Sequence, residues 1–269
     1  MIVFDNVPPS ATGVIHIDLG QIAANWRALA TAVHGARCAA VVKANGYGLG
    51  VQRVVPALLK AGCQSFFVAT IDEAVEVRKL AAEQAIFVLD GLLPGAEKAV
   101  TDINAIPVLS SLTEIEEWSA HARKLDEELP TALHIDTGLN RLGMPSEDVR
   151  ALAAGGALLE KLQVYLVMSH LASADDPDDA KNATQRAVFE GLLPLLPTVA
   201  TSIAASDGLL LGPEFHGQLV RPGYALYGGQ ASKSTPAPVK PVVSVHARVL
   251  QVNEIATGQT VGYSATYQA

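Results

Sequence analysis

The chain is poor in cysteine and in positive charge. Its 269 residues include only two cysteines, Cys38 and Cys63, and neither belongs to a CxxC pair. A disulfide framework is therefore excluded, and the apolar context of both residues predicts buried thiols in a reducing compartment. The formal net charge is -8, and the sequence has no long basic run. Because nucleic acids and anionic membrane surfaces bind concentrated positive charge, neither is an expected partner.

Long hydrophobic runs and metal-ligand spacings are also missing. The apolar runs are too short to cross a bilayer, and the N-terminus lacks the basic and apolar regions of a signal peptide. No HxH or HExxH pattern occurs, so no metal site is expected. These absences predict a cytoplasmic protein without a membrane segment.

What the sequence does contain is an alternation of strand-like and helical segments. Short runs rich in Val, Ile and Phe predict strands, and longer Ala- and Leu-rich segments have helical periodicity. The expected strands are Cys38–Val42, Ser65–Ala69, Ile86–Leu89, Ile106–Leu109, Ala132–Asp136, Val164–Ser169, Thr201–Ala205 and Gln218–Val220. The expected helices are Leu19–Ala32, Val51–Ala61, Ile71–Ala82, Gly95–Val100, Leu112–Lys124, Ser146–Ala154, Asp179–Leu196 and a short piece after Ser206.

Eight almost wholly apolar strands separated by helices predict a parallel α/β sheet closed into a (β/α)8 TIM barrel. A doubly wound open sheet is the alternative. Gly46, Gly48 and Gly50 form a G-x-G-x-G pattern, whereas dinucleotide-binding sheets use G-x-G-x-x-G. The glycine spacing therefore favours the barrel.

The composition changes after Gly229. Residues 231–240 are rich in Pro and Ser and predict a linker between a barrel at 1–230 and a β-rich segment at 241–269. That segment is interpreted as the beginning of a second, all-β domain. The chain ends at Ala269 before such a sheet could close. We therefore expect a longer natural protein, or strands supplied from elsewhere.

Basic and polar residues follow the ends of the expected strands, where a TIM barrel carries its active site. They are Lys43, Tyr47, His134, Asp136, Arg141, His170, Ser206, Arg221, Gly223 and Tyr224. In an acidic protein, this group indicates a phosphate-bearing ligand. Barrels often bind phosphate in the loops after strands seven and eight, which here contain Ser206 and Gly223–Tyr224.

Lys43 ends an apolar strand. A lysine at such a position usually just reaches solvent, but apolar flanks favour the neutral amine, which is a nucleophile toward aldehydes. Facing a phosphate site, it predicts a Schiff base with pyridoxal phosphate. Structural roles stay open for the others. His170 could be a core histidine, Arg221 a loop clamp, Asp136 a partner of its own turn, and Tyr263 an ordinary strand aromatic.

Five motifs in order along the chain resemble the alanine racemase family of fold-type III pyridoxal-phosphate enzymes. They are "VVKANGYGLG", "HIDTGLNRLGM", "MSHLASAD", "RPGYALYG" and "VGYSATY". The resemblance implies racemisation of L-alanine and D-alanine, which supplies D-alanine for cell-wall peptidoglycan. It also implies a head-to-tail homodimer with shared active sites.

The resemblance further implies roles for single residues. Lys43 would hold the cofactor and move the substrate proton on one face. Tyr263 of the partner subunit would act on the other face, because one lysine reaches only one side. A cationic His170 is one way to lower the pKa of that tyrosine. Arg141 would lie near the substrate carboxylate. The implied cofactor contacts are Tyr47, His170, Ser206, Arg221, Gly223 and Tyr224.

The chain departs from the family pattern at His134. Family members have a lysine there, which many of them carbamylate and use to orient the arginine that corresponds to Arg141. Our hypothesis is that a small bound anion takes the place of the carbamate.

Three alternative functions remain. A broad-specificity amino-acid racemase has the same fold. A decarboxylase of this fold usually has an acid where Arg221 lies. A non-catalytic pyridoxal-phosphate homeostasis protein is a lone barrel and needs neither the linker nor "VGYSATY".

Overall fold

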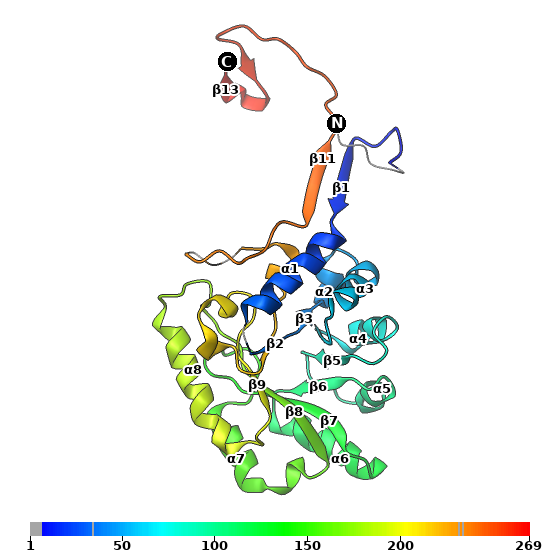
Figure 1. Ribbon diagram of the computed structural model, residues 1–269, viewed down its shortest axis with the longest axis vertical. Coiled ribbons are helices and arrows are strands. Elements are labelled where there is room, and N and C mark those ends of the chain that lie inside the picture. Colours follow the sequence, from blue (N-terminus) through cyan, green and yellow to red (C-terminus); the bar gives the residue numbers. More distant parts are fainter. Residues whose placement is uncertain (1–6, 34, 231, 233) are drawn as a thin grey trace. The chain divides into compact units, whose positions relative to one another are not determined.

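A computed structural model of the chain describes residues 7–33, 35–230, 232 and 234–269. These residues form two units. The larger is Asp18–Val242, a set of parallel strands with helices around them, and the smaller contains the N-terminal strand and Val243–Ala269 (Figure 1). The helices of the described part are too short or too polar to span a bilayer.

The strands and helices of the larger unit alternate along the chain. Its strands are β2 (Arg37–Cys38), β3 (Ala40–Val41), β4 (Ser65–Val68), β5 (Ala85–Val88), β6 (Ile106–Leu109), β7 (Leu129–His134), β8 (Leu162–Met168), β9 (Ala200–Ser202) and β10 (Leu219–Val220). Its helical segments are α1 (Leu19–Ala32), α2 (Lys43–Tyr47), α3 (Val51–Ala61), α4 (Ile71–Arg78), α5 (Glu97–Asp102), α6 (Leu112–Leu125), α7 (Ser146–Gly155) and α8 (Ala180–Leu192).

The strands close into a barrel. Strands β3 to β9 pair in sequence order, all parallel, and β10 pairs in parallel with β2. On its other side, the β10 segment reaches the β9 segment through Gln218 N–H to Thr201 O at 2.9 Å and Arg221 N–H to Ala204 O at 3.0 Å. The predicted (β/α)8 TIM barrel is confirmed, and the open-sheet alternative is wrong.

The first barrel strand is divided. The expected strand Cys38–Val42 is observed as β2 and β3, because Arg37–Cys38 pair with β10 whereas Ala40–Val41 pair with β4. Ala39 still donates its N–H to Val220 O at 2.9 Å, so the backbone continues between the two pairings. The first strand is thus divided at the point where the barrel closes, between its pairing with β10 and its pairing with β4.

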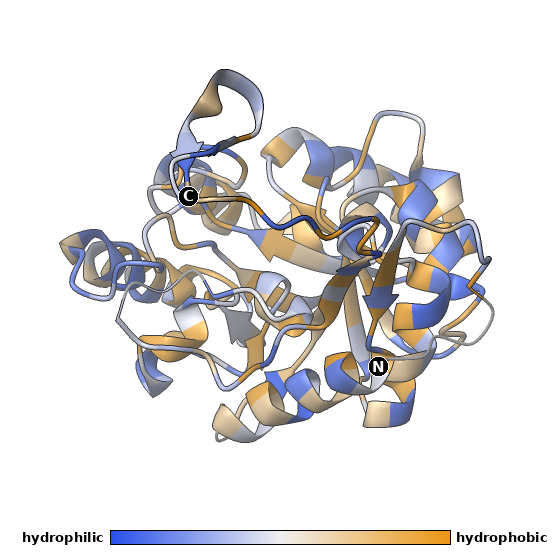
Figure 2. Ribbon diagram, turned by 90° about the horizontal axis from the view of Figure 1, so that it is seen from above, coloured by the Kyte–Doolittle hydropathy of each residue, from blue (hydrophilic) through white to orange (hydrophobic). Residues whose placement is uncertain are grey.

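Apolar side chains fill the barrel interior. The core cluster contains Phe67 and Phe87, whose rings stack with centroids 4.4 Å apart. The strands are mainly orange in Figure 2, and the surrounding helices alternate orange and blue. This pattern follows from helices that bury one face against the sheet and expose the other. Both cysteines are buried and free, as expected, and burial raises the pKa of Cys63 to about 12.

Most helices begin at the residues that the sequence predicts. Ser111 caps α6 by accepting the Glu114 N–H at 3.2 Å, and Thr70 caps α4 in the same way. Two expected helices end early. Helix α4 stops at Arg78, whose guanidinium binds the Ala81 and Ala82 carbonyls beyond the helix. Helix α8 stops at Leu192 and becomes a 3₁₀ turn that contains Pro194.

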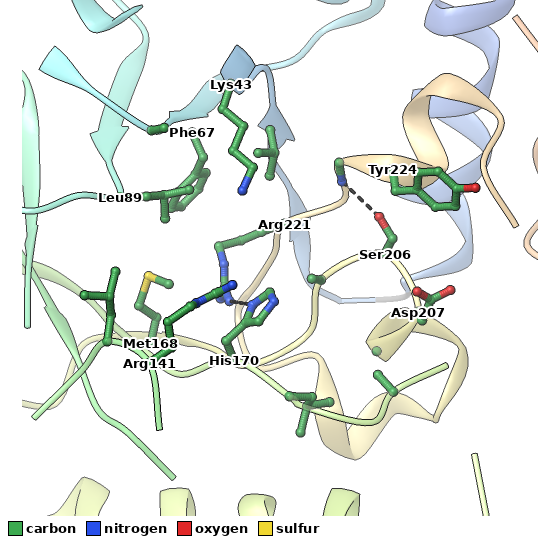
Figure 3. Close-up of a pocket in the computed structure, with 18 of the residues that line it drawn as sticks. Lys43, Phe67, Leu89, Arg141, Met168, His170, Ser206, Asp207, Arg221 and Tyr224 are labelled. Atoms are coloured by element: carbon green, nitrogen blue, oxygen red, sulfur yellow. Dashed lines mark hydrogen bonds between the residues drawn. The ribbon is translucent and has the colours of Figure 1, made fainter. Parts of the chain in front are cut away.

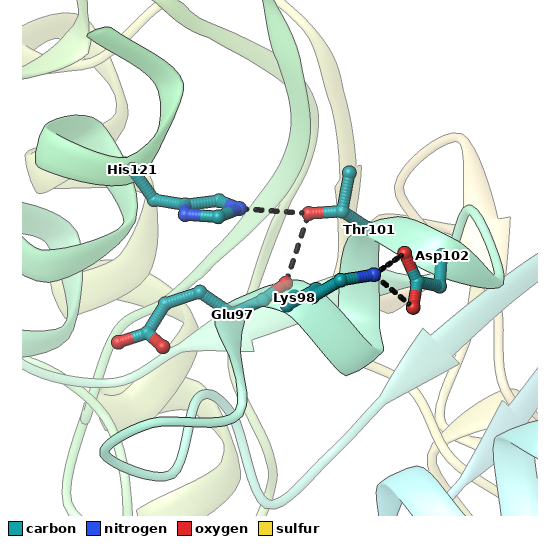
Figure 4. Close-up of polar contacts among 5 residues, drawn as sticks. All are labelled: Glu97, Lys98, Thr101, Asp102 and His121. Carbon is teal, nitrogen blue, oxygen red and sulfur yellow. Dashed lines mark hydrogen bonds and ion pairs between the residues drawn. The ribbon is translucent and has the colours of Figure 1, made fainter. Parts of the chain in front are cut away.

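Helix α5 is short and is held to its neighbour α6 by a polar contact. Thr101 binds His121 of α6 at 3.1 Å and donates to the Glu97 carbonyl at 2.9 Å (Figure 4). The Lys98–Asp102 pair on the same helix is exposed and contributes little to stability. The expected helix Gly95–Val100 thus begins and ends later, at Glu97–Asp102.

The described residues that follow the last barrel strand, up to Val242, belong to the larger unit and are bound to it by side-chain hydrogen bonds. The Gln230 side chain accepts the Ala237 N–H at 2.8 Å and donates to the Ala237 carbonyl at 2.9 Å. Asn25 of α1 binds both the N–H and the carbonyl of Lys240, at 2.9 and 2.8 Å. Of the residues expected to be a linker, Ala237 and Lys240 are therefore anchored to the larger unit.

The smaller unit is all β. Strand β1 (Gly13–Ile17) pairs antiparallel with β11 (Val243–Ala247), and β12 (Thr260–Val261) pairs with β13 (Tyr267–Gln268). The sequence did not predict β1, which the expected boundaries place with the barrel. The division into 1–230, 231–240 and 241–269 stays a prediction.

Candidate active site

A cavity of about 520 Å³ opens at the C-terminal ends of the barrel strands. Figure 3 shows basic and polar side chains that point into it from different strand ends. All eight barrel residues to which the sequence assigned a role line it: Lys43, Tyr47, Arg141, His170, Ser206, Arg221, Gly223 and Tyr224. Residues more than 170 positions apart are brought together because parallel strands end at one rim.

Lys43 opens a left-handed turn. Ala44, Asn45 and Gly46 have φ/ψ values of 52/48°, 54/48° and 64/45°, and Tyr47 has φ of 55°. The label α2 therefore covers a segment that is not a right-handed helix. Each non-glycine residue in this conformation costs about 1–2 kcal/mol. Neighbouring contacts must hold the turn, and its effect is to aim both Lys43 and Tyr47 at the cavity.

Ser206 joins the two loops that the sequence assigned to phosphate. Its hydroxyl oxygen accepts the Gly223 N–H at 3.0 Å and the Ala225 N–H at 3.1 Å. The hydroxyl hydrogen stays available to a ligand. A Cβ on Gly223 would lie 2.3 Å from the Tyr47 hydroxyl and 3.2 Å from Val41 Cβ. The missing side chain at Gly223 therefore makes the space in which the Tyr47 hydroxyl approaches this loop.

Arg221 is buried at the floor of the cavity. Its guanidinium donates to the Ser202 hydroxyl and to the Ser169 carbonyl, the latter at 2.6 Å, and lies 3.5 Å from His170 Nδ1. Burial lowers its pKa to about 9, which leaves it charged at neutral pH. The guanidinium carbon is 6.0 Å from the Phe67 ring centroid. Fixed donors and packing thus hold a cation in one orientation.

Both cavity histidines are neutral at neutral pH. Burial, followed by the positive charge of Arg221, lowers the pKa of His170 to about 3 and that of His134 to about 4. The expectation of a cationic His170 is therefore wrong for the chain described here. His134 Nδ1 lies 3.2 Å from the Ser110 hydroxyl. The anion expected beside Arg141 stays a prediction.

Asp136 serves its own turn. Its Oδ1 accepts the N–H groups of Gly138, Leu139 and Asn140 at 2.9, 3.0 and 3.1 Å. Gly143 has φ of 112°, and a Cβ there would lie 2.6 Å from the Asp136 nitrogen. This turn ends β7 and brings Arg141 to the cavity rim. Asp136 is therefore a partner of its own turn, which is the structural alternative that the sequence left open.

Two residues of this region were not singled out by the sequence. Tyr227 packs its ring 4.7 Å from that of Tyr47 and donates its hydroxyl to the Val41 carbonyl at 3.1 Å. Its place in "RPGYALYG" was the only available indication. Glu73 of α4 accepts the Ala44 N–H at 2.6 Å. The two residues are far apart in the sequence, so no local pattern could reveal this contact.

Tyr263 belongs to the smaller unit and is fully exposed there. It follows Gly262 and opens a short turn, Tyr263–Ala265, that precedes β13. The cavity is built from residues of the larger unit, and Tyr263 is not among those that line it.

Comparisons with known proteins agree with this geometry. The family model for the N-terminal domain of alanine racemase matches residues 17–231. Alanine racemase from Methylobacterium sp. (strain 4-46) is 47% identical over 253 residues, which cover 94% of this chain and 69% of that protein. Catabolic alanine racemase from Agrobacterium fabrum is 44% identical over 260 residues, which cover 96% of this chain and 67% of that protein.

A solved structure is also similar. The crystal structure of alanine racemase from Bartonella henselae with covalently bound pyridoxal phosphate has a TM-score of 0.87 and 40% sequence identity. The match covers 96% of this chain and 72% of that one. From the domain match and these identities it follows that the chain belongs to the alanine racemase family.

Proposed function

We propose that this chain racemises alanine with pyridoxal phosphate bound in the cavity at the barrel mouth. The observation that carries the proposal is the convergence of Lys43, buried Arg221 and the Ser206–Gly223 loop pair on one cavity. The related structure from Bartonella henselae binds that cofactor covalently, which supports the same group here.

The described residues fit the cofactor. At the phosphate end, the Ser206 hydroxyl, the Tyr47 hydroxyl and the absent side chain of Gly223 form a small polar cradle. Among the described hydrogen bonds, none occupies the Tyr224 N–H, which can bind an anion. At the ring end, Arg221 supplies a permanent donor. His170 would lie beside the ring, Arg141 near the substrate carboxylate, and Lys43 would carry the aldehyde carbon.

When bound, pyridoxal phosphate withdraws electrons and so acidifies the α-proton of an amino acid. The protein must then remove that proton on one face and return one on the other. Lys43 is proposed as the base on one face. Because Arg221 only donates, it would keep the pyridine nitrogen unprotonated and limit electron withdrawal. Limited electron withdrawal would suit racemisation and would disfavour side reactions such as transamination.

We propose Tyr263 of the partner subunit as the base on the second face. In this proposal the protein is a head-to-tail homodimer, and each barrel is completed by the smaller unit of the other chain. Large apolar side chains of that unit, such as Leu250 and Val252, are exposed, which supports association.

The biological role we propose is a cytoplasmic supply of D-alanine for peptidoglycan. The catabolic name of the Agrobacterium relative favours a second role, the breakdown of alanine. The two roles use the same chemistry at the same residues.

A direct experiment tests the activity. The purified full chain is incubated with pyridoxal phosphate, and absorbance, borohydride trapping and loss of optical rotation with L-alanine are measured. We expect a yellow protein that borohydride fixes at Lys43 and that racemises alanine. Bound cofactor without racemisation would favour a binding protein, and equal rates with larger amino acids would favour a broad-specificity racemase.

A second experiment tests the two faces. In Tyr263→Phe, loss of the α-proton from L-alanine should fall far more than loss from D-alanine, as measured by deuterium uptake from solvent. Equal decreases for the two isomers would contradict the assignment of the faces.

A further inference from the structure

Glu73 lies on α4, outside the set of residues that line the cavity, yet its carboxylate bonds to the turn that carries Lys43. Its Oε1 accepts the Ala44 N–H at 2.6 Å, and its Oε2 accepts the Ala69 N–H at 2.7 Å. We propose that Glu73 is a positioning residue that sets the Lys43–Tyr47 turn for cofactor binding. This inference rests on the proposed function.

The Glu73 carboxylate binds the chain where the hydrogen bonds between β3 and β4 end. Val42 donates its N–H to the Phe67 carbonyl at 2.8 Å, which is the last such bond from β3 to β4 before the chain turns left-handed. The next donor along that edge, Ala44 N–H, is held by Glu73 instead. Lys43 therefore lies between two fixed amides, one held by a strand and one by a side chain.

Glu73 is itself rigidly placed. It is the third residue of α4, and its own N–H is bound by the Thr70 hydroxyl at 3.3 Å. Its bond back to Ala69, the residue before that cap, completes a reciprocal arrangement that resembles a capping box. One carboxylate thus ties the start of a helix, the end of β4 and the lysine turn together.

The turn needs such support. Ala44, Asn45 and Tyr47 all have positive φ without being glycine, so the conformation is disfavoured on its own. Asn45 contributes by accepting the Val51 N–H at 2.9 Å, and Gly46 donates to Val42 at 2.8 Å. Lys43 and Tyr47 are the two ends of the turn. Relaxation of its backbone would move the amine and the phosphate-facing hydroxyl together.

The chain offers a matched control at Glu114 on α6. The Ser111 hydroxyl accepts the Glu114 N–H. The Glu114 carboxylate in turn accepts the Ser110 N–H at 2.5 Å and the Leu92 N–H at 3.2 Å. Glu114 follows β6, and Leu92 lies in the loop after the neighbouring strand β5. In the same way, Glu73 follows β4, and Ala44 lies in the segment after the neighbouring strand β3. The same device therefore occurs in two βα units, but the Leu92 loop carries no lysine. A helix-capping effect alone would be common to both glutamates.

The experiment compares Glu73→Gln and Glu73→Ala with Glu114→Gln and Glu114→Ala in the full chain. Three quantities are measured: the Kd for pyridoxal phosphate by absorbance, the midpoint of urea unfolding without cofactor, and hydrogen exchange at the Ala44 amide. A glutamine retains one acceptor but turns an N–H₂ group toward the second amide. We expect about tenfold weaker cofactor binding and about tenfold faster Ala44 exchange in Glu73→Gln.

For Glu114→Gln we expect a similar shift of the unfolding midpoint, with a cofactor Kd within about twofold of wild type. Equal losses of cofactor affinity in both glutamine variants would overturn the proposal, because helix capping would explain them. Unchanged affinity and Ala44 exchange in Glu73→Gln would overturn it too. If Glu73→Ala does not fold, the glutamine pair decides. A wild-type chain that binds no cofactor would refute the proposed function, and Ala44 exchange would still decide whether Glu73 holds the turn.

Discussion

The two ends of the barrel each contain an arginine without a carboxylate partner among the described residues. At the base, Arg78 donates to the carbonyls of Ile103, Ala81, Ala82, Gln84 and Asn104 at 2.8–3.0 Å. At the mouth, Arg221 donates to one hydroxyl and one carbonyl and still lines the cavity. The Arg78 guanidinium is thus occupied by backbone carbonyls, whereas Arg221 has two protein acceptors and also faces a cavity.

Both ends also contain a cavity, about 520 Å³ at the mouth and about 240 Å³ at the base. The basal cavity is lined by Arg78 but contains no histidine among its lining residues, whereas the mouth contains His134 and His170. An arginine and a cavity thus occur at both ends of the barrel. We expect the arginine to serve stability at the base and the chemistry to take place at the mouth. The predictions below test this contrast in order of expected effect.

The largest effect should come from the lysines at the two ends. Lys43→Ala should lower alanine racemisation by at least about 10³-fold, because it removes both the cofactor attachment and a base. Lys60→Ala, in the last turn of α3 at the opposite end, should leave the rate unchanged. Polarimetry with both isomers measures the rates. A Lys43→Ala protein that keeps a borohydride-reducible cofactor would contradict the attachment.

The second comparison exchanges each arginine for methionine. Arg78→Met should lower the free energy of unfolding by about 2–3 kcal/mol, since several carbonyls lose a charged donor. Arg221→Met should change it by less than about 1 kcal/mol, because loss of an unpaired buried charge offsets the lost bonds. Urea unfolding without cofactor measures both. A larger loss in the free energy of unfolding for Arg221→Met than for Arg78→Met would contradict the assignment of a structural role to Arg78 alone.

The third prediction concerns pH. His134 and His170 have pKa values of about 4 and about 3 in the folded chain, against 6.5 without burial. Between these values the unfolded chain binds more protons, so stability present above pH 6.5 is lost as the pH falls toward 4 for His134 and toward 3 for His170. At pH 5 the loss should be about 2 kcal/mol for each histidine.

The measurement is urea unfolding of the cofactor-free chain at pH 7 and pH 5. Replacement of both histidines by glutamine should flatten the dependence, whereas Arg78→Met should leave its slope unchanged. A double glutamine variant with the wild-type slope would mean that other groups are responsible.

The smallest effect is expected at two glycines. Gly223→Ala places a Cβ 2.3 Å from the Tyr47 hydroxyl and should weaken pyridoxal-phosphate binding about fivefold, or about 1 kcal/mol. Gly155→Ala, near the end of α7, meets no atom within 4 Å and should raise stability by about 0.5–1 kcal/mol without changing cofactor binding. Titration by absorbance distinguishes the two, and equal affinities would show that the Gly223 space is dispensable.

The fold was largely predictable because hydrophobic periodicity repeats in every βα unit. The helices Leu19–Ala32 and Val51–Ala61 and the strand Ile106–Leu109 were placed with the observed bounds. Errors arose where distant residues decide local structure. The Arg78 guanidinium takes carbonyls beyond α4, the first strand divides between two partners, and β1 pairs with a strand more than 200 residues away.

The sequence by itself determined the barrel, its rim of basic residues and the family motifs, because strand order and strand ends are local properties of the chain. Only the tertiary structure decided which cations stay charged, that His170 is neutral, and that Asp136 serves its own turn. It also decided that Glu73 of α4 holds the amide next to Lys43. Desolvation and cross-element hydrogen bonds depend on groups that meet only when the barrel closes.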